Sequence, residues 1–303
     1  MRFATQQFFT KERQILSQFW VVSFYLIHIS QGQIVKLLPG DVKAVIFKSN
    51  DPWLLHIGEA SEKIREIDIK YRGIFRNAVM ARETIVQEQI FLQDTISRST
   101  THVIFPYGSE VIKKRELTKE VSLKKALKSV LSIPDRTVQL PNTVDSKNER
   151  LRAFFQEAYA INPMKFPVLF FTDSMKAPSH YKTLVLKYSS LFHFGIVHEP
   201  TPMMKSTYSI MSLPHFTALI VDNLGREKQP RVKKIPYVES AYGSLEYPYM
   251  VRFLYMLHKY HYKDLRHSSA HTYDVELDEL FMEDLQRFES DYIRRPIQQK
   301  TEL

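Results

Sequence analysis

Short apolar runs alternate along this chain of 303 residues with segments whose apolar residues recur at helical spacing. In the first part of the chain, Val42–Ser49 (VKAVIFKS) is rich in β-branched residues and predicts a buried central strand. Residues 58–71 place Ile64, Ile67 and Tyr71 on one side of a predicted helix. A strand is then predicted at Ile74–Met80, followed by a polar helix through Gln89. A hairpin is predicted at residues 101–116 and an amphipathic helix at Ser122–Leu131.

The same order of elements recurs in the second part of the chain. Strands are predicted at Phe166–Thr172, Phe192–His198 and Leu213–Asp222, with an edge strand at Arg231–Tyr237. A helix at Ser179–Ser190 and a short helix at Met203–Tyr208 connect the first three strands, and a helix at Leu245–Tyr260 follows the edge strand. Residues 132–150 contain two prolines and a polar run, which indicates a linker. Each half therefore reads β-α-β-α-β-β-α, with crossovers that make two strand pairings parallel and a hairpin that adds an antiparallel edge.

This order resembles the thioredoxin fold over roughly residues 33–132 and 150–262. The local motif that carries the resemblance is Leu213-Pro214 before a buried strand, where that fold places a cis-proline beside a Cys-x-x-Cys pair. In the first half, Ser99-Thr100-Thr101-His102 occupies the equivalent loop without a proline. The expected fold class is α/β, with two tandem thioredoxin-like domains, each a mixed central sheet flanked by helices, and a C-terminal acidic helix.

The predicted organisation has five parts. They are a signal peptide or uncleaved anchor (1–32), a first thioredoxin-like domain (33–132), a linker (133–149), a second such domain (150–262) and an acidic helical tail ending in KTEL (263–303).

The chain contains no cysteine. Disulfides, thiolate metal sites and thiol nucleophiles are therefore excluded, and so is thiol–disulfide exchange, which needs sulfurs. The windows equivalent to the redox site, residues 50–56 and 173–178, offer no substitute. The chain thus resembles cysteine-free, non-catalytic members of the protein disulfide isomerase family. That resemblance implies a chaperone, a substrate-binding module or a spacer, without a cofactor and without enzymatic activity.

A thioredoxin-like domain without its sulfurs can retain a strip of backbone against which an extended peptide pairs. Residues beside the two predicted grooves would supply apolar contacts to such a peptide. They are Trp53, Leu54, Leu55 and His56 in the first half, and Met175, Pro214, His215 and Phe216 in the second. The alternative is that these side chains serve only the core and the helix caps.

Both ends of the chain predict a location. A basic segment precedes the mostly apolar residues 15–29, and small residues follow at Ser30 and Gly32. As a helix, residues 15–29 would be about 22 Å long, which is shorter than the roughly 30 Å hydrocarbon core of a bilayer. These features predict a signal peptide, with an uncleaved anchor or a buried amphipathic helix as alternatives. The last four residues, Lys300, Thr301, Glu302 and Leu303, are a variant of the endoplasmic reticulum retrieval signal. The expected location is the lumen of that organelle, with the retrieval receptor as one partner.

Charge and histidine patterns add little chemistry. The net charge of +9 is spread out without a nucleic-acid-binding motif, so no nucleic acid partner is expected. Residues 274–291 combine eight acids with an apolar stripe, which favours a helix docked on a basic surface over low-affinity calcium binding. Histidines 258, 261, 267 and 271 favour a surface patch over a metal site, and no metal is expected.

The sequence thus predicts a non-enzymatic protein that binds client polypeptides, such as unfolded or extended secretory segments, or another lumenal folding factor. The alternative is a structural subunit or scaffold of a lumenal or membrane-attached complex, and membrane attachment requires an uncleaved N-terminal segment. A third possibility is an enzyme whose site uses the histidines.

Overall fold

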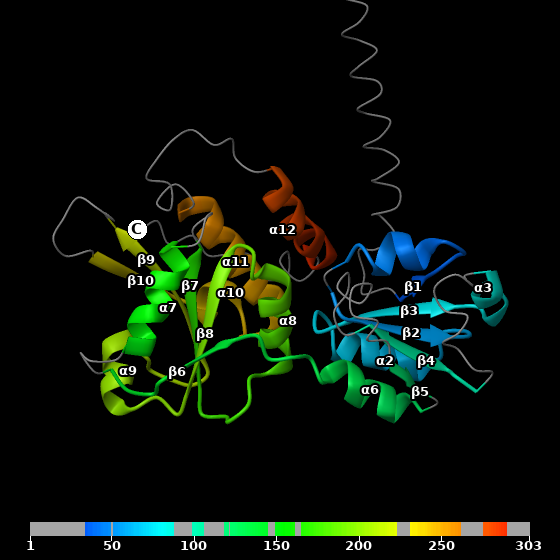
Figure 1. The fold of residues 1–303 in the computed structure, drawn as a ribbon, viewed down its shortest axis with the longest axis horizontal. Helices are drawn as coiled ribbons and strands as arrows, with labels where there is room; N and C mark the ends of the chain where they lie inside the picture. Colours follow the sequence, from blue (N-terminus) through cyan, green and yellow to red (C-terminus); the bar gives the residue numbers. More distant parts are fainter. Residues whose placement is uncertain are drawn as a thin grey trace, which may run out of the picture.

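A computed structural model describes residues 34–49, 51–87, 99–105, 118–120, 122–144, 149–160, 165–222, 231–261 and 275–289. They form an α/β protein with two five-stranded mixed sheets, each flanked by helices (Figure 1). We call the part from β1 to α6 the first half and the part from β6 to α11 the second half. The first half consists of β1 (Val35–Lys36), η1 (Val42–Ile46), β2 (Trp53–Ile57), α2 (Glu62–Lys70), β3 (Arg76–Met80), α3 (Arg82–Gln87), β4 (His102–Phe105), β5 (Thr118–Glu120) and α6 (Leu123–Leu131).

The second half repeats this succession, and one more helix follows it. Its elements are β6 (Val138–Leu140), α7 (Glu149–Ala160), β7 (Phe166–Thr172), α8 (Ser179–Tyr188), β8 (Phe192–His198), α9 (Pro202–Tyr208), β9 (His215–Asp222), β10 (Arg231–Pro236), α10 (Glu239–Tyr242) and α11 (Tyr247–His261), followed by α12 (Val275–Arg287).

Both sheets have the same topology. The strand orders are β1-β3-β2-β4-β5 and β6-β8-β7-β9-β10, parallel across the first three strands and antiparallel across the last two pairings. This is the thioredoxin-like arrangement, and it confirms the predicted fold class. In the second half, β7 and β8 have the predicted bounds, and the bounds of the other predicted elements lie within two residues of those observed.

The prediction for Val42–Ser49 was wrong. Residues 42–46 form the helical turn η1, with Val42 and Ile46 buried one turn apart. A short apolar run fits either a strand or a helix, and Asp41, at the N-cap position after Pro39 and Gly40, is a helix start signal. The central strand of the first half is β2, which lies closer to the C-terminus than the predicted strand.

The stretch predicted as a linker also contributes to the fold. Val138–Leu140 forms β6, which pairs in parallel with β8 at the edge of the second sheet. A strand and a helix therefore precede the central strand of each half: β1 and η1 in the first, β6 and α7 in the second.

The central strand β7 is buried at every position because helices cover both faces of its sheet. Phe166, Val168 and Phe170 pack with α8 and α11, whereas Leu169 and Phe171 pack with α7 and α9. This alternation follows from the two-residue period of a strand. It fixes the carboxyl end of β7, where the loop 173–178 begins.

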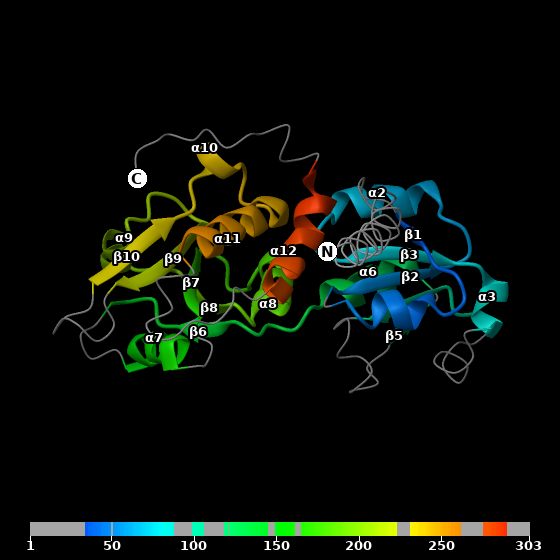
Figure 2. The same ribbon diagram turned by 90° about the horizontal axis from the view of Figure 1, so that it is seen from above.

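Helix α12 lies between the two halves in both ribbon views (Figures 1 and 2). Phe281 of this helix and Phe288, which directly follows its last residue, are fully buried. No helix in the described part of the chain is long and apolar enough to cross a bilayer. The predicted signal peptide, the predicted hairpin turn and the terminal KTEL lie outside the described residues.

Candidate functional site

Two loops of the second half lie at the edge of the sheet where β7 and β8 have their carboxyl ends, which is where open α/β sheets bind ligands. The last residue pair of β7 and β9 is Phe171 with His215, so the loop 173–178 lies opposite residues 211–214. The Leu213–Pro214 peptide bond is cis, as the sequence motif indicated. Met175 on the first loop is 73% exposed and Met211 on the second is 95% exposed.

Local hydrogen bonds hold both loops in place. The backbone N–H of Ser174 donates to Thr172 Oγ1 (3.1 Å), and the Ser174 carbonyl lies 2.5 Å from His198 Nδ1. The second loop begins where α9 ends at Ser209, a residue with left-handed backbone (φ 56°), and the Ile210 N–H donates to the Lys205 carbonyl (2.8 Å).

The backbone of Met211–Leu213 has no hydrogen-bond partner in the part of the chain that the structure describes. Among the described residues, no hydrogen bond joins the N–H or C=O groups of these three residues to another part of the chain. An extended peptide could pair with such a strip, as in β-augmentation. We call Met175, Pro214 and Met211–Leu213 the methionine surface.

His215 and Phe216 contribute less to this surface than predicted. Phe216 is only 1% exposed and packs among Phe170, Tyr181 and Phe253, so the prediction that it contacts a peptide was wrong. His215 is half-buried, and burial lowers its pKa below the usual histidine value.

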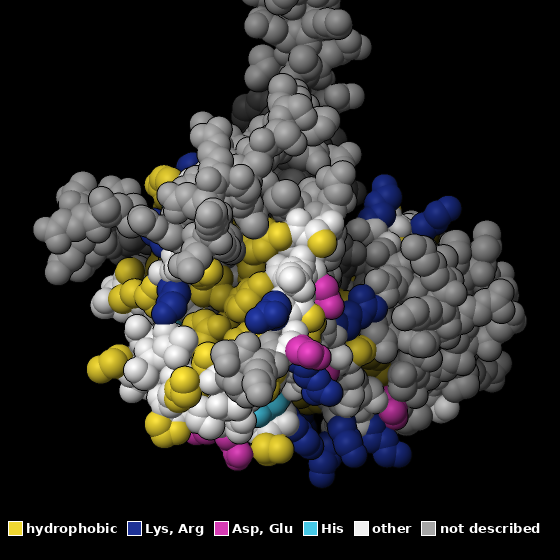
Figure 3. All heavy atoms as spheres, turned by 60° about the vertical axis from the view of Figure 1, so that its left-hand side comes forward, with side chains coloured by type: hydrophobic (Ala, Val, Ile, Leu, Met, Phe, Trp, Pro, Cys, Tyr) yellow, Lys and Arg dark blue, Asp and Glu magenta, His cyan; other side chains and the backbone are white. Residues whose placement is uncertain are grey.

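Figure 3 shows a face of the second half on which hydrophobic side chains are exposed in several groups.

The predicted groove of the first half does not exist at the residues named for it. Trp53, Leu54 and Leu55 have no exposed surface, and His56 is 2% exposed, because all four belong to the central strand β2. The loop equivalent to 173–178 is instead residues 58–61, between β2 and α2. The guanidinium carbon of Arg76 lies 4.5 Å from the centroid of the Trp53 ring, so the indole makes a cation–π contact with Arg76.

His56 belongs to a buried row of polar side chains that crosses the first sheet. Its Nδ1 lies 3.1 Å from His102 Nδ1, and its Nε2 lies 3.1 Å from Asn77 Oδ1. Asn77 Nδ2 in turn donates to Asp68 Oδ1 (2.8 Å). The amide oxygen of Asn77 thus faces His56, so His56 Nε2–H donates to it and His56 Nδ1 accepts from His102.

The pKa values in this row favour uncharged imidazoles. Burial lowers the pKa of His56 to about 4 and lowers that of His102, while burial raises the pKa of Asp68. The row satisfies buried polar atoms of β2, β3, β4 and α2. Sequence reasoning missed it because its members are separated along the chain.

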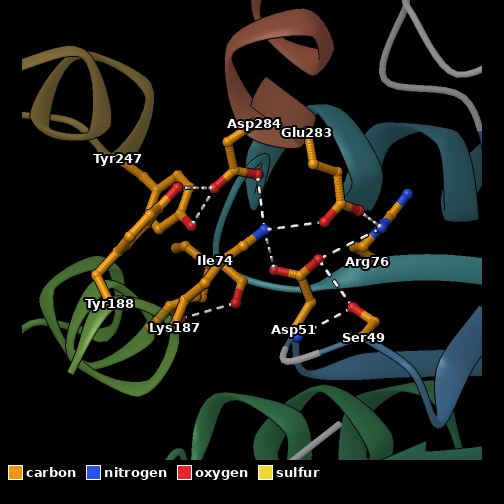
Figure 4. A network of polar contacts seen from close by, with 10 residues as sticks. Ser49, Asp51, Ile74, Arg76, Lys187, Tyr188, Tyr247, Glu283 and Asp284 are labelled. Carbon is orange, nitrogen blue, oxygen red and sulfur yellow. Dashed lines mark hydrogen bonds and ion pairs between the residues drawn. The ribbon is translucent and has the colours of Figure 1, made fainter. Parts of the chain in front are cut away.

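A second polar cluster joins the two halves to α12 (Figure 4). Lys187 Nζ on α8 lies 3.2 Å from Asp51 Oδ1 of the first half and 3.0 Å from Asp284 Oδ1 of α12. The hydroxyls of Tyr188 and Tyr247 donate to Asp284 Oδ2 at 2.8 and 2.7 Å. Asp284 is fully buried, so its carboxylate depends on these donors from the second half.

Arg76 and Glu283 complete the cluster. Arg76 Nη1 donates to Glu283 of α12 and lies 3.4 Å from Asp51 Oδ2. Lys187 Nζ is also 3.6 Å from Glu283 Oε2. Three carboxylates therefore surround two cations, and the nearby Arg287 adds a third positive charge that also acts on Asp51 and Glu283.

Charge pairing outweighs burial in the pKa values of this cluster. Burial by itself would raise the pKa of Asp51, but Lys187 and Arg76 hold it well below its ordinary value. Burial would likewise lower the pKa of Lys187, but Asp284 and Asp51 raise it. Lys187 likewise lowers the pKa of Glu283, so both Asp51 and Glu283 favour the ionised form beside the charged Lys187.

Other predicted features are placed as follows. His258 is buried against Phe166 and Phe281, His261 is half-buried at the end of α11, and histidines 267 and 271 lie outside the described residues. Within the described ranges, no three His, Asp or Glu side chains are grouped so that they could hold a metal ion. The carboxylates of Glu283 and Asp284 pair with cations of the protein.

No family model matches this chain, and no curated protein matches it. Among solved structures, full-length ERdj5 is 12% identical over 80% of this chain and 34% of that one, with a TM-score of 0.42. Zinc-bound human ERp44 is 10% identical over 83% and 65% of the two chains (TM-score 0.25). The bb fragment of ERp72 is 15% identical over 75% and 96% (TM-score 0.26). The chain spans about a third of the length of full-length ERdj5. These structural neighbours are thioredoxin-like proteins of the protein disulfide isomerase family.

Proposed function

We propose that this protein binds extended apolar segments of client polypeptides, or of another folding factor, through the methionine surface and without catalysing a reaction. The observation that carries the proposal is the backbone of Met211–Leu213, which finds no hydrogen-bond partner in the described ranges, together with the exposed side chains of Met175 and Met211. Backbone pairing gives affinity for any extended chain, and flexible thioether side chains adapt to varied apolar partners.

Redox chemistry does not compete with this role. The chain lacks cysteine, and thiol–disulfide exchange requires a thiolate and a second sulfur. The loop where such a pair would lie reads Asp173-Ser174-Met175-Lys176-Ala177. A methionine thioether there offers apolar contact area and no nucleophilic thiolate.

The test is binding of a fluorescent, extended, apolar peptide without cysteine, followed by anisotropy. The double variant Met175→Ser, Met211→Ser should weaken binding about tenfold, because two exposed apolar anchors are removed. Leu38→Ser is the matched control, since Leu38 is 55% exposed on the first half. Equal affinity of the double variant and the wild type would show that the methionine surface is not the binding site.

A scaffold without client binding is the second candidate, and the cluster that locks both halves to α12 favours it. A scaffold should ignore the fluorescent peptide in every variant. It should instead be recovered from its compartment in one complex of fixed stoichiometry, which size-exclusion chromatography with light scattering would show.

The proposed location is the lumen of the endoplasmic reticulum, on the basis of residues 15–32 and 300–303. Removal of residues 300–303 from the expressed chain should increase its secretion. Unchanged retention of that variant in the cell would argue against receptor-based retrieval.

A further inference from the structure

Helix α12 contacts the rest of the protein as a separate ligand would. Its partners come from both halves, and we call them the α12 interface: Asp51, Arg72, Arg76, Lys187, Tyr188 and Tyr247. Residues 262–274 connect α12 to α11 along the chain. The contacts fall into two apolar anchors and a pair of acids.

Phe281 and Phe288 are the apolar anchors, and both are fully buried. The ring of Phe281 stacks on Tyr188 (centroids 4.8 Å apart, 22° between planes). The ring of Phe288 lies 6.0 Å from Tyr247 and 5.1 Å from the guanidinium of Arg72. Fully desolvated aromatic anchors of this kind carry most of the free energy in helix recognition.

Asp284 lies between the anchors on the same side of α12. Positions 281, 284 and 288 are spaced by three and four residues, which places them on one helix face. Met282, Gln286 and Glu289 are exposed. The helix thus presents a Phe-x-x-Asp-x-x-x-Phe pattern to the α12 interface, with Glu283 at its edge.

The charge of the α12 interface selects an acidic helix. Without α12, the buried Arg76 and Lys187 would have, among the described residues, a carboxylate within ion-pair distance only at Asp51. An arriving helix that lacks acids would leave these cations buried and underpaired, which is strongly unfavourable. An acidic amphipathic helix supplies the missing negative charges.

We propose that the α12 interface is a recognition site for acidic amphipathic helices, and that it accepts α12 of a second copy of this chain in exchange for its own. The exchanged helix would make the same contacts as the resident one, so exchange costs little at equilibrium. The connection of thirteen residues, 262–274, can span on the order of 40 Å when extended, which is long enough to reach a neighbouring copy.

The absence of cysteine makes the exchange measurable by site-specific labelling. One preparation carries a donor dye at Gln286→Cys on the exposed side of α12, and another carries an acceptor at Ile69→Cys, which is 75% exposed on α2. Mixing the two full-length chains should produce intermolecular energy transfer that grows with protein concentration. A mixture without such transfer over days, at any concentration, would overturn the proposal.

A second measurement tests recognition directly. A protease site is placed within 262–274 of the full-length chain and cut after folding, and fluorescein-labelled peptide 275–289 is then added. The peptide should displace the resident helix. Asp284→Asn should weaken the peptide at least about tenfold, whereas Met282→Ala, at a 41% exposed position, should change its Kd less than about twofold. Failure of the wild-type peptide to bind, or equal binding of the Asn peptide, would refute recognition by the α12 interface. The result is independent of the methionine surface.

Discussion

At the scale of single residues, Asp284 carries a buried carboxylate that needs several hydrogen-bond donors. It is fully buried, and three donors of the second half satisfy its two oxygens. A buried ion pair often contributes little net stability compared with apolar residues of the same shape, but removal of one partner leaves an uncompensated charge. The cluster therefore specifies where α12 binds, and single substitutions in it are costly.

Asp284→Asn tests this cost. The amide keeps the shape of the side chain but removes the charge that Lys187 Nζ faces at 3.0 Å. We expect the free energy of unfolding to fall by about 3 kcal/mol in chemical denaturation. Glu289→Gln, an exposed acid near the end of the same helix, is the control and should change stability by less than about 0.5 kcal/mol. Similar losses in both variants would contradict the assigned role of Asp284.

The buried histidine row predicts a dependence of stability on pH. The pKa of His56 is about 4 in the folded protein and 6.5 when unperturbed, so between these values the unfolded chain binds more protons. Stability contributed by neutral His56 is complete above about pH 6.5 and is lost as the pH falls toward 4, by at most about 3 kcal/mol. The raised pKa of Asp68 opposes part of this loss at the acidic end.

The measurement is the free energy of unfolding from pH 7 to pH 4.5 for the wild type and for His56→Gln. The variant should lose less stability over this range, since it lacks the group that the unfolded state protonates. Identical slopes for the wild type and His56→Gln would show that His56 does not remain neutral in the folded state.

At the scale of elements, the turn between α2 and β3 packs directly on α11. Gly73 in this turn has φ +82°, and a Cβ built on it would lie 2.5 Å from Cδ1 of Tyr247. Thr183 Oγ1 on α8 donates to the Ile74 carbonyl of the same turn (2.8 Å). The glycine is required because the backbone of one half approaches an aromatic ring of the other.

Gly73→Ala should therefore destabilise the protein by about 2–3 kcal/mol, from backbone strain and from the clash with Tyr247. Gly58→Ala is a matched control, because Gly58 also has positive φ (+119°) but has no atom within 4 Å of a built Cβ. The difference between the two variants in thermal or chemical unfolding isolates the contact between halves. No difference would mean that this contact contributes nothing to stability.

The bounds of some elements could be predicted from the sequence, and those of others could not. The apolar runs of β7 and β8 are long, bounded by polar turns and rich in aromatic and β-branched residues, so their bounds could be read directly. Val42–Ser49 could not, because Val42 and Ile46 are compatible with either period. That error moved the expected groove onto β2, where Trp53 and Leu54 are core residues.

Only part of the candidate site could be predicted, because burial of a strand residue depends on pairing between distant segments. Exposure of Met175 and Pro214 follows from their positions in loops, whereas the burial of Phe216 depends on the register of β9 against β7. The α12 cluster joins residues that are 97, 136 and 207 positions apart, and no local pattern pairs them. The amphipathic stripe of 274–291 predicted a docked helix, but its docking site required the assembled halves.

At the scale of the whole molecule, the cluster makes the stability of one half depend on the other. Lys187 belongs to the second half, yet its ammonium pairs with Asp51 of the first half and with α12. Its loss would leave Asp51 and Asp284 buried with fewer partners, a cost of about 3 kcal/mol. If the cluster couples the halves, this cost should appear when only the unfolding of the first half is observed.

Trp53 provides that observation. It is fully buried in the first half, and the chain has only two tryptophans, so Trp20→Phe leaves Trp53 as the sole indole. In this background, Lys187→Met should lower the denaturant midpoint of Trp53 fluorescence and keep a single transition. Lys182→Met, one and a half turns earlier on α8 and half-buried, is the control and should leave the free energy of unfolding reported by Trp53 within about 0.5 kcal/mol of the parent. An unchanged Trp53 midpoint in Lys187→Met, with loss of stability confined to the second half, would show that the two halves unfold independently and that the cluster does not couple them.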